Sequence, residues 1–212
     1  MLVLPAPDMD PDTNSWQKCP SAKEISEAST RTKIEQLLRP LEAGYEGWIK
    51  TTLTGAPQEV LDKAKDALKR IKEGIDMLCI DDTSRIAFNI ANRAIYQSNK
   101  WANDIKSKKD PNHVPREFVW RKFQLAFALS TLESVSNPQS SRRKELDLLW
   151  VATGGGKTEA YLLTMAYTIV MRRLQAKKDP ALPQWHGVDV ITRYTLRLLT
   201  IQQSRRTLGM VS

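Results

Sequence analysis

The spacing of apolar residues predicts helices over the first half of the chain. Between residues 22 and 50, and again between 57 and 80, apolar side chains recur every three or four positions, which places them on one face of a helix. Pro40 interrupts the first pattern, so we expect a kink or a split there. Pro57 suits the first turn of the second helix, where a proline has no hydrogen bond to lose.

A third helix is expected at 81–101, because the Asp, Thr and Ser residues at its start can cap free backbone N–H groups. The residues before 22 are rich in Pro, Asp and Asn and show no periodicity, which is typical of an irregular tail. We therefore expect a tail at 1–21 and a helical bundle or hairpin at 22–103. The apolar faces of this region are interpreted as packing surfaces.

A less regular region follows the bundle. The polar, basic stretch 105–115 predicts a loop, and 115–135 predicts a fourth helix that ends before the turn signal Asn137-Pro138. We take residues 104–145 as a linker with one helix.

The apolar pattern changes at residue 146. Residues 146–152 form a short continuous apolar run, which is typical of a strand buried on both faces of a parallel sheet. A helix-forming segment follows from Lys157 to Gln175, and 188–192 predicts a second strand before a further helical segment. This order predicts a right-handed parallel βαβ unit. The expected fold class is therefore α/β, with a helical N-terminal region and, at 146–212, the first part of a P-loop (RecA-like) parallel sheet.

The charge is distributed unevenly along the 212 residues. The formal net charge is +8, but residues 1–99 hold 13 Lys and Arg against 15 Asp and Glu, whereas residues 100–212 hold 19 against 9. A basic half attracts polyanions such as DNA. A basic surface that only contacts water explains the same numbers equally well.

Several classes of protein are disfavoured by the composition. The chain has two cysteines, Cys19 and Cys79, which is too few for a disulfide scaffold. No run of about 18 apolar residues indicates a membrane span, and the start does not resemble a secretory signal, so we expect a cytoplasmic protein. The two histidines, His113 and His186, have no metal-ligand spacing with cysteines or carboxylates.

The segment VATGGGKTEAYL (151–162) joins the first expected strand to the helix after it. Gly154, Gly155 and Gly156 have no side chains, so their N–H groups could converge on one phosphate group. The helix that begins at Lys157 would add the positive end of its dipole. Three glycines could instead form a simple flexible connector.

The two residues after the glycines favour the phosphate interpretation. The ammonium of Lys157 could reach the outer phosphates, and the Thr158 hydroxyl could bind the magnesium ion that accompanies a nucleotide. Val151 stands where the strict P-loop (Walker A) pattern has glycine. We expect ATP and Mg²⁺ as cofactors.

Three segments together resemble superfamily 2 helicases. LLWVATGGGKTEAYL resembles motif I, VITRYTLRLLTIQQ resembles motif Ia, and WRKFQLAFALSTL resembles the upstream segment whose glutamine contacts adenine. With FNIANRAIYQ, the set is similar to the large helicase of DISARM phage-defence systems, over about residues 30–206. This resemblance implies ATP-driven movement on DNA and a role in restricting phage DNA.

The resemblance also implies the residues of the site. The phosphates and magnesium would be held by Thr153, Gly154, Gly155, Gly156, Lys157 and Thr158, with Lys157 and Thr158 catalytic and Thr158 reaching the metal. Gln124, beside Phe123, would contact adenine, although a polar residue on a helix face is an equal explanation. DNA would lie against Thr192, Arg193, Thr195 and Arg197, whose arginines could equally be surface residues at a helix start.

Parts of a helicase are missing from the motif set. Beyond Glu159 the only acids are Asp179 and Asp189, and neither suits the acidic pair that such enzymes use for magnesium and water. No second RecA-like lobe is present. We therefore expect the ATP-binding front part of a larger enzyme, or a truncated gene product, that does not hydrolyse ATP by itself. A non-enzymatic interaction module with a vestigial or regulatory nucleotide site is one alternative, and a kinase-like P-loop enzyme is another.

Overall fold

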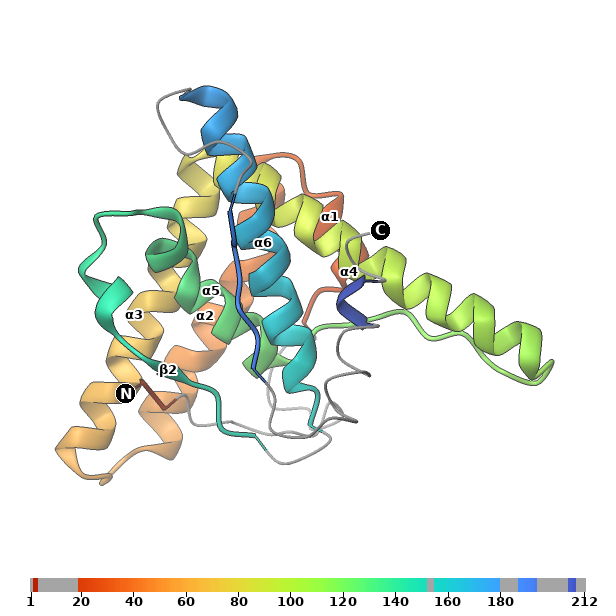
Figure 1. The fold of residues 1–212 in the computed structure, drawn as a ribbon. Coiled ribbons are helices and arrows are strands. Elements are labelled where there is room, and N and C mark those ends of the chain that lie inside the picture. Colours follow the sequence, from red (N-terminus) through yellow and green to blue (C-terminus); the bar gives the residue numbers. More distant parts are fainter. Residues whose placement is uncertain (1, 4–18, 152–154, 180–186, 194–205, 209–212) are drawn as a thin grey trace.

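The computed structural model describes residues 2–3, 19–151, 155–179, 187–193 and 206–208, and helices dominate them (Figure 1). The helices are α1 (Ala22–Ser26), α2 (Arg31–Thr52), α3 (Gln58–Ile80), α4 (Asp82–Lys109), α5 (Lys122–Ser136), the short 3-10 helix η1 (Ser141–Lys144) and α6 (Lys157–Lys178). Two short strands, β1 (Leu2–Val3) and β2 (Asp147–Leu148), complete the described elements.

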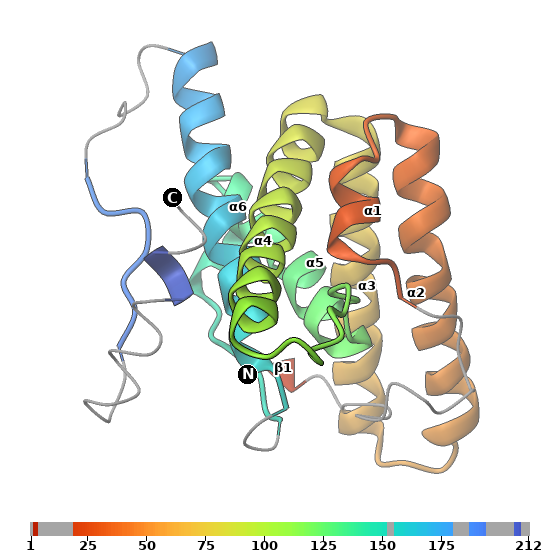
Figure 2. The same cartoon turned by 90° about the vertical axis from the view of Figure 1, so that its right-hand side faces the viewer.

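The long helices lie side by side (Figure 2). Helix α3 packs between α2 and α5, α6 packs between α5 and α4, and α1 covers α4. One apolar cluster contains buried residues from α1 to α6, among them Ile25, Leu38, Ile75, Phe88, Leu129 and Tyr167. Helix α6, which follows the glycine loop, is therefore part of the same packed core as the preceding helices.

A glycine permits a close contact between α3 and α5. A Cβ atom placed on Gly74 of α3 would lie 2.2 Å from the backbone oxygen of Leu129 on α5. No other residue type fits at that position without moving one helix, so Gly74 sets how closely α3 and α5 approach.

The expected parallel P-loop sheet is contradicted by the structure. In the described part of the chain, β2 covers only two of the residues 146–152 and pairs in parallel with β1, from the stretch where an irregular tail was expected. The apolar run is not buried on both faces: Leu146 and Trp150 are 74% and 75% exposed, whereas Leu149 and Val151 are buried. A strand with one covered face was therefore misinterpreted as the centre of a sheet.

The prediction of a second strand at 188–192 is also wrong. These residues do not form a strand and run beside α6 (Figure 1). Side-chain ion pairs hold them there, because Asp189 lies 2.6 Å from Arg172 and 3.3 Å from Arg173 of α6. The apolar residues of this segment thus predicted a strand, whereas ion pairs of its Asp189 side chain determine where the segment lies.

The helix predictions were closer to the structure. Asp81 caps α4 as expected, since its carboxylate accepts hydrogen bonds of 3.0 Å from the N–H groups of Thr83 and Ser84. Helix α2 runs through Pro40, and the break comes earlier, where Thr30 caps its start. None of the described helices has the length and apolar character needed to cross a bilayer.

Two helix boundaries differ from the expectation. Helix α4 continues to Lys109, so part of the expected loop 105–115 is helical. Helix α5 begins at Lys122, because the residues before it pair with the segment in front of α1. The N–H of Ala22 donates to the Phe118 oxygen at 3.1 Å, and the N–H of Trp120 donates to the Pro20 oxygen at 3.2 Å. Backbone pairing over a long sequence separation therefore displaces the first turns of the predicted helix.

Candidate nucleotide-binding site

The described part of the glycine loop ends in a left-handed residue that starts α6. Gly156 has φ +85° and ψ 26°, and α6 begins at the next residue, Lys157. This conformation strains any residue with a side chain. A Cβ on Gly156 would also lie 2.8 Å from the Gln124 amide nitrogen. The left-handed φ therefore favours glycine at position 156, and a Cβ there would require the end of the Gln124 side chain to shift. Thr153 and Gly154 lie outside the described residues.

Two side chains at the start of α5 hold this loop. The Gln124 amide nitrogen donates to the Gly156 oxygen at 2.7 Å, and the Arg121 guanidinium donates to the Gly155 oxygen at 2.8 Å. The Gln124 amide oxygen in turn accepts the Arg121 backbone N–H at 2.9 Å. Gln124 is 2% exposed, so this contact is shielded from water.

The direction of these hydrogen bonds fixes the direction of the loop N–H groups. In a planar trans peptide the C=O and the following N–H point in opposite directions. Because the oxygens of Gly155 and Gly156 face α5, the N–H groups of Gly156 and Lys157 face away from it. The structure thus directs two backbone donors away from α5 at the N-terminus of the 22-residue helix α6, where the helix dipole favours an anion.

The charged residues of the first α6 turn also contact the loop and its neighbours. The Lys157 ammonium donates to the Val151 oxygen, and Glu159 forms an ion pair with Arg206. The second Glu159 carboxylate oxygen, Oε2, is buried without a hydrogen-bond partner among the described atoms. Thr158, the expected magnesium ligand, follows Lys157 in this turn.

An apolar layer supports the loop. Leu149 and Val151, on the segment that leads into the loop, pack with side chains of α3, α5 and α6 in a cluster separate from the main core. Its buried members are Ala67, Phe123, Phe127, Leu149, Val151 and Ala160. Phe123, expected near adenine, is therefore part of the layer that supports the loop.

A buried ion pair fixes the start of that segment. Arg70 of α3 holds Asp147 of β2 with two hydrogen bonds of 2.6 and 2.9 Å, and its Nε donates to the Ser130 oxygen of α5 at 3.1 Å. The Arg70 side chain is 1% exposed. A bidentate arginine in such surroundings defines both distance and orientation.

Sequence reasoning missed Arg70 and Arg121. A signal existed for Arg70, because it falls on the apolar face of α3 between the buried residues Ala67 and Ile71. A cation on a core face requires a buried acceptor. No pattern marks Arg121, whose contact depends on how the segment before α5 pairs with the chain near Ser21.

The expected nucleic-acid residues are described only in part. Thr192 and Arg193 are exposed, and with Phe127, Tyr161 and Thr164 they border a cavity of about 430 Å³ beside α6. Thr195 and Arg197 lie outside the described residues. The structure therefore brings the end of the segment 187–193 to the α6 face that carries Tyr161.

Comparison with known proteins bears on the resemblance. No protein-family model matches the chain. DISARM protein DrmA from Bacillus paralicheniformis (strain ATCC 9945a / NCIMB 11709 / CD-2) is 35% identical over 204 residues, which cover 91% of this chain. The resemblance to DrmA is confirmed. The chain spans 18% of the DrmA length, and the match includes the helical region as well as the glycine loop.

Proposed function

We propose that the chain contributes the ATP-binding front part of a DNA helicase or translocase that acts in phage defence. The similarity to DrmA, whose name places it in DISARM, supports the defence role. The geometry of the loop supports nucleotide binding, because Gly156 in the left-handed region leads directly into α6, and the N–H groups of Gly156 and Lys157 point away from α5. This last observation is the one on which the proposal rests.

The residues of the site fit a magnesium triphosphate. The backbone around Gly155 and Gly156 would bind phosphate oxygens, Lys157 would neutralise their charge, and the Thr158 hydroxyl would ligate the metal. Gly154 and Thr153 would extend the same cradle. Bound magnesium would supply neutralisation of the charge on the phosphates.

Gln124 and Arg121 have a defined part in this proposal. Both donate to loop oxygens, so they hold the loop in the shape that presents its N–H groups. Gln124 would additionally contact adenine. Such a contact requires an exchange of partners, because the amide nitrogen of Gln124 is bonded to Gly156 and its amide oxygen to the Arg121 N–H.

The basic second half of the chain would place DNA near this site. Thr192, Arg193, Thr195 and Arg197 would bind the phosphate backbone without reading bases. Turnover would require acids and a second lobe that the motif set of this chain lacks. We therefore expect binding of ATP and DNA, and no multiple-turnover hydrolysis by the 212-residue chain.

Titration calorimetry with magnesium-ATP tests the nucleotide site. Lys157→Ala should weaken binding at least about tenfold, since it removes a charge-assisted contact to phosphate. Lys177→Ala is the matched control, because Lys177 is exposed near the other end of α6. Equal affinities for the two variants would contradict the proposal. A chain that binds no ATP but retains a protein partner would favour the non-enzymatic module.

A further inference from the structure

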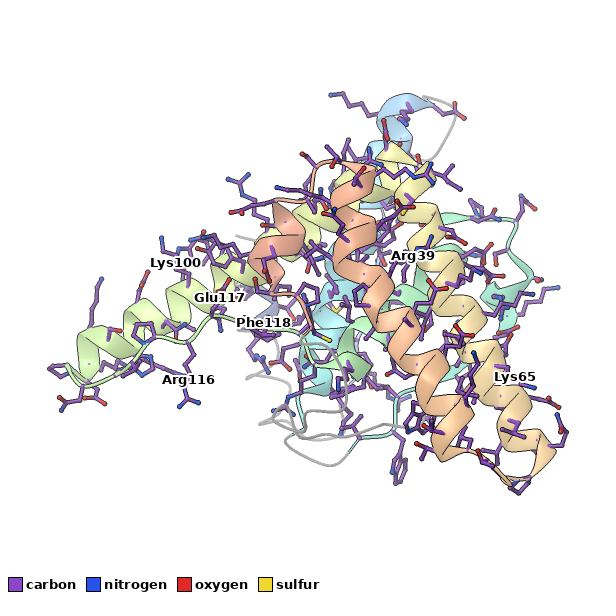
Figure 3. The ribbon with its side chains drawn as sticks, turned by 180° about the vertical axis from the view of Figure 1, so that it is seen from behind. Arg39, Lys65, Lys100, Arg116, Glu117 and Phe118 are labelled. Carbon is purple, nitrogen blue, oxygen red and sulfur yellow. The ribbon has the colours of Figure 1, made fainter. Side chains whose placement is uncertain are left out.

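The second half of α4 and the segment that returns from it extend away from the helix bundle (Figure 1). We name residues 98–116 the α4 arm. The buried residues of α4 end at Ile95, so the arm adds nothing to the core. Lys100 and Arg116, on the outgoing and returning parts, lie at one end of the molecule, while Lys65 of α3 lies at the other (Figure 3).

The arm has hydrogen bonds of its own that define its shape. The Asn103 amide nitrogen donates to the Arg116 oxygen at 2.9 Å, and the His113 ring nitrogen Nε2 lies 3.2 Å from the Asn103 amide oxygen. At the tip, the His113 N–H donates to the Asp110 oxygen at 3.0 Å. The returning segment is thereby tied to the helix.

The arm carries exposed cations that form no ion pair with the other described residues. It holds five Lys and Arg residues against two Asp residues. In the ion pairs of the described residues, none of Lys100, Lys106, Lys108, Lys109 and Arg116 takes part. By contrast, some exposed lysines of α2 and α3 pair with neighbouring acids, as in Lys50–Glu46 and Lys63–Glu59.

The helix dipole accounts for only part of this charge. Lys106, Lys108 and Lys109 lie in the last turn of α4, where cations stabilise a helix. Lys100 lies more than one turn earlier, and Arg116 lies beyond the helix. The charge therefore extends along the arm, and Lys100 and Lys109 are about 13 Å apart along the helix axis.

Large apolar side chains accompany these cations. Trp101 is 41% exposed and Ile105 is 55% exposed, and the spacing of four residues places both on one helix face with Lys108 in the next turn. An exposed indole between lysines can stack on a nucleobase while the lysines contact phosphates. An acidic protein would satisfy the cations but would not require a flat aromatic surface.

We propose that the α4 arm binds single-stranded nucleic acid without sequence preference. Trp101 stacks on a base, and Lys100, Lys108, Lys109 and Arg116 contact the phosphates around it. This surface is separate from the glycine loop and goes beyond the proposed function. The returning segment leads along the chain to Arg121, whose guanidinium contacts Gly155. The proposed nucleic-acid surface is therefore close in sequence to a residue that holds the glycine loop.

Fluorescence anisotropy with a labelled oligothymidylate at several salt concentrations tests the charges. The triple variant Lys100→Ala, Lys108→Ala, Lys109→Ala should weaken binding at least about tenfold and reduce the steepness of the salt dependence by about 2, since each single-strand phosphate contact contributes about 0.7. The control is Lys50→Ala, Lys63→Ala, Lys65→Ala, which removes the same charge from α2 and α3. Equal loss in both variants would overturn the proposal, because net charge alone would then explain it.

The indole is tested separately. Trp101→Ala should lose about tenfold in affinity, and Trp101→Phe should retain most of it, because phenylalanine also stacks. An unchanged thermal unfolding midpoint shows that the variants fold, and unchanged magnesium-ATP affinity separates this result from the nucleotide site. If the wild-type chain and Trp101→Ala bind a blunt duplex with equal affinity, the ligand of the arm is duplex nucleic acid. If polyglutamate competes fully with the oligothymidylate, the partner of the arm is an acidic protein. Either outcome would overturn the single-strand assignment.

Discussion

Arg70 of α3 and Asp147 of β2 form a buried bidentate ion pair across 77 residues of sequence. The pair joins a helix of the bundle to the segment that leads into the glycine loop. The Arg70 Nε also donates to the Ser130 oxygen, so Arg70 links α3 to α5 as well as to β2. The position of the loop therefore depends on a residue that lies far from it in sequence.

Removing Arg70 should destabilise the fold strongly. Arg70→Met leaves the Asp147 carboxylate half-buried without its main partner, which costs about 3–5 kcal/mol in comparable pairs. Urea unfolding followed by circular dichroism measures the loss. Arg31→Ala is the control, because its pair with Glu35 is largely exposed and should contribute less than about 1 kcal/mol. A similar cost for both variants would show that the buried pair adds nothing special.

Gly156→Ala should destabilise the fold more than Gly55→Ala does. Gly55 has nearly the same φ, +79°, and a Cβ at that position would meet no atom within 4 Å, so Gly55→Ala measures the backbone strain alone, about 1–2 kcal/mol. Gly156→Ala adds the contact with the Gln124 amide nitrogen. Its unfolding free energy should therefore fall further, and magnesium-ATP affinity should fall with it.

The combination with Gln124→Ala separates the two costs of Gly156→Ala. If the contact with Gln124 is responsible, removing that side chain should recover part of the loss, as read from a double-mutant cycle. Strictly additive losses would indicate that the backbone angle alone restricts this position to glycine.

The Asp81 cap predicts a specific dependence of stability on pH. Burial raises the pKa of Asp81, but hydrogen bonds from Ser84 and Thr83 outweigh it, and the pKa is lowered from the ordinary 3.8. The cap is then fully stabilising above pH 3.8 and is lost as the pH falls through the lowered pKa. Asp81→Ala should cost about 1 kcal/mol near neutral pH, and the difference from wild type should shrink in acid. A pH-independent difference would contradict this assignment.

Cys19 should react slowly with thiol reagents in the folded chain. Burial raises the pKa of its thiol to about 11, against a smaller opposite effect of Lys122. At about pH 8 only about one thiol in a thousand is then ionised. Ellman's reagent should modify Cys19 much faster after unfolding in urea, and a Cys79→Ala background isolates the signal. A rate in the folded chain equal to that of free cysteine would show that the thiol is accessible.

The sequence predicted helices better than strands for a physical reason. A period of three to four residues reports one buried face, and α3 followed it closely. Apart from Asp147, the run at 146–152 is apolar, but burial alternates along it, so hydrophobicity alone could not show that Trp150 is exposed. The segment 188–192 is held by the Asp189 ion pairs, which depend on where α6 lies.

In the candidate site, too, local sequence patterns were predicted and long-range contacts were not. The glycines and Lys157 were identified because a phosphate cradle has a local pattern. Arg121 and Arg70 act through contacts with loop and strand residues that lie 34 and 77 positions away. Such contacts follow from helix packing, which a single sequence does not specify.

Helix α6 both begins at the glycine loop and packs in the main core, and this affects how the chain can be shortened. Tyr167, in the middle of α6, is buried against Phe88 of α4 and bonds to Ser136 of α5 at 2.6 Å. A polypeptide that stopped at residue 103 would expose the surfaces of α3 and α4 that α5 and α6 cover, and it would tend to aggregate. Deletion studies that aim to isolate the front helices should therefore keep α5 and α6 attached.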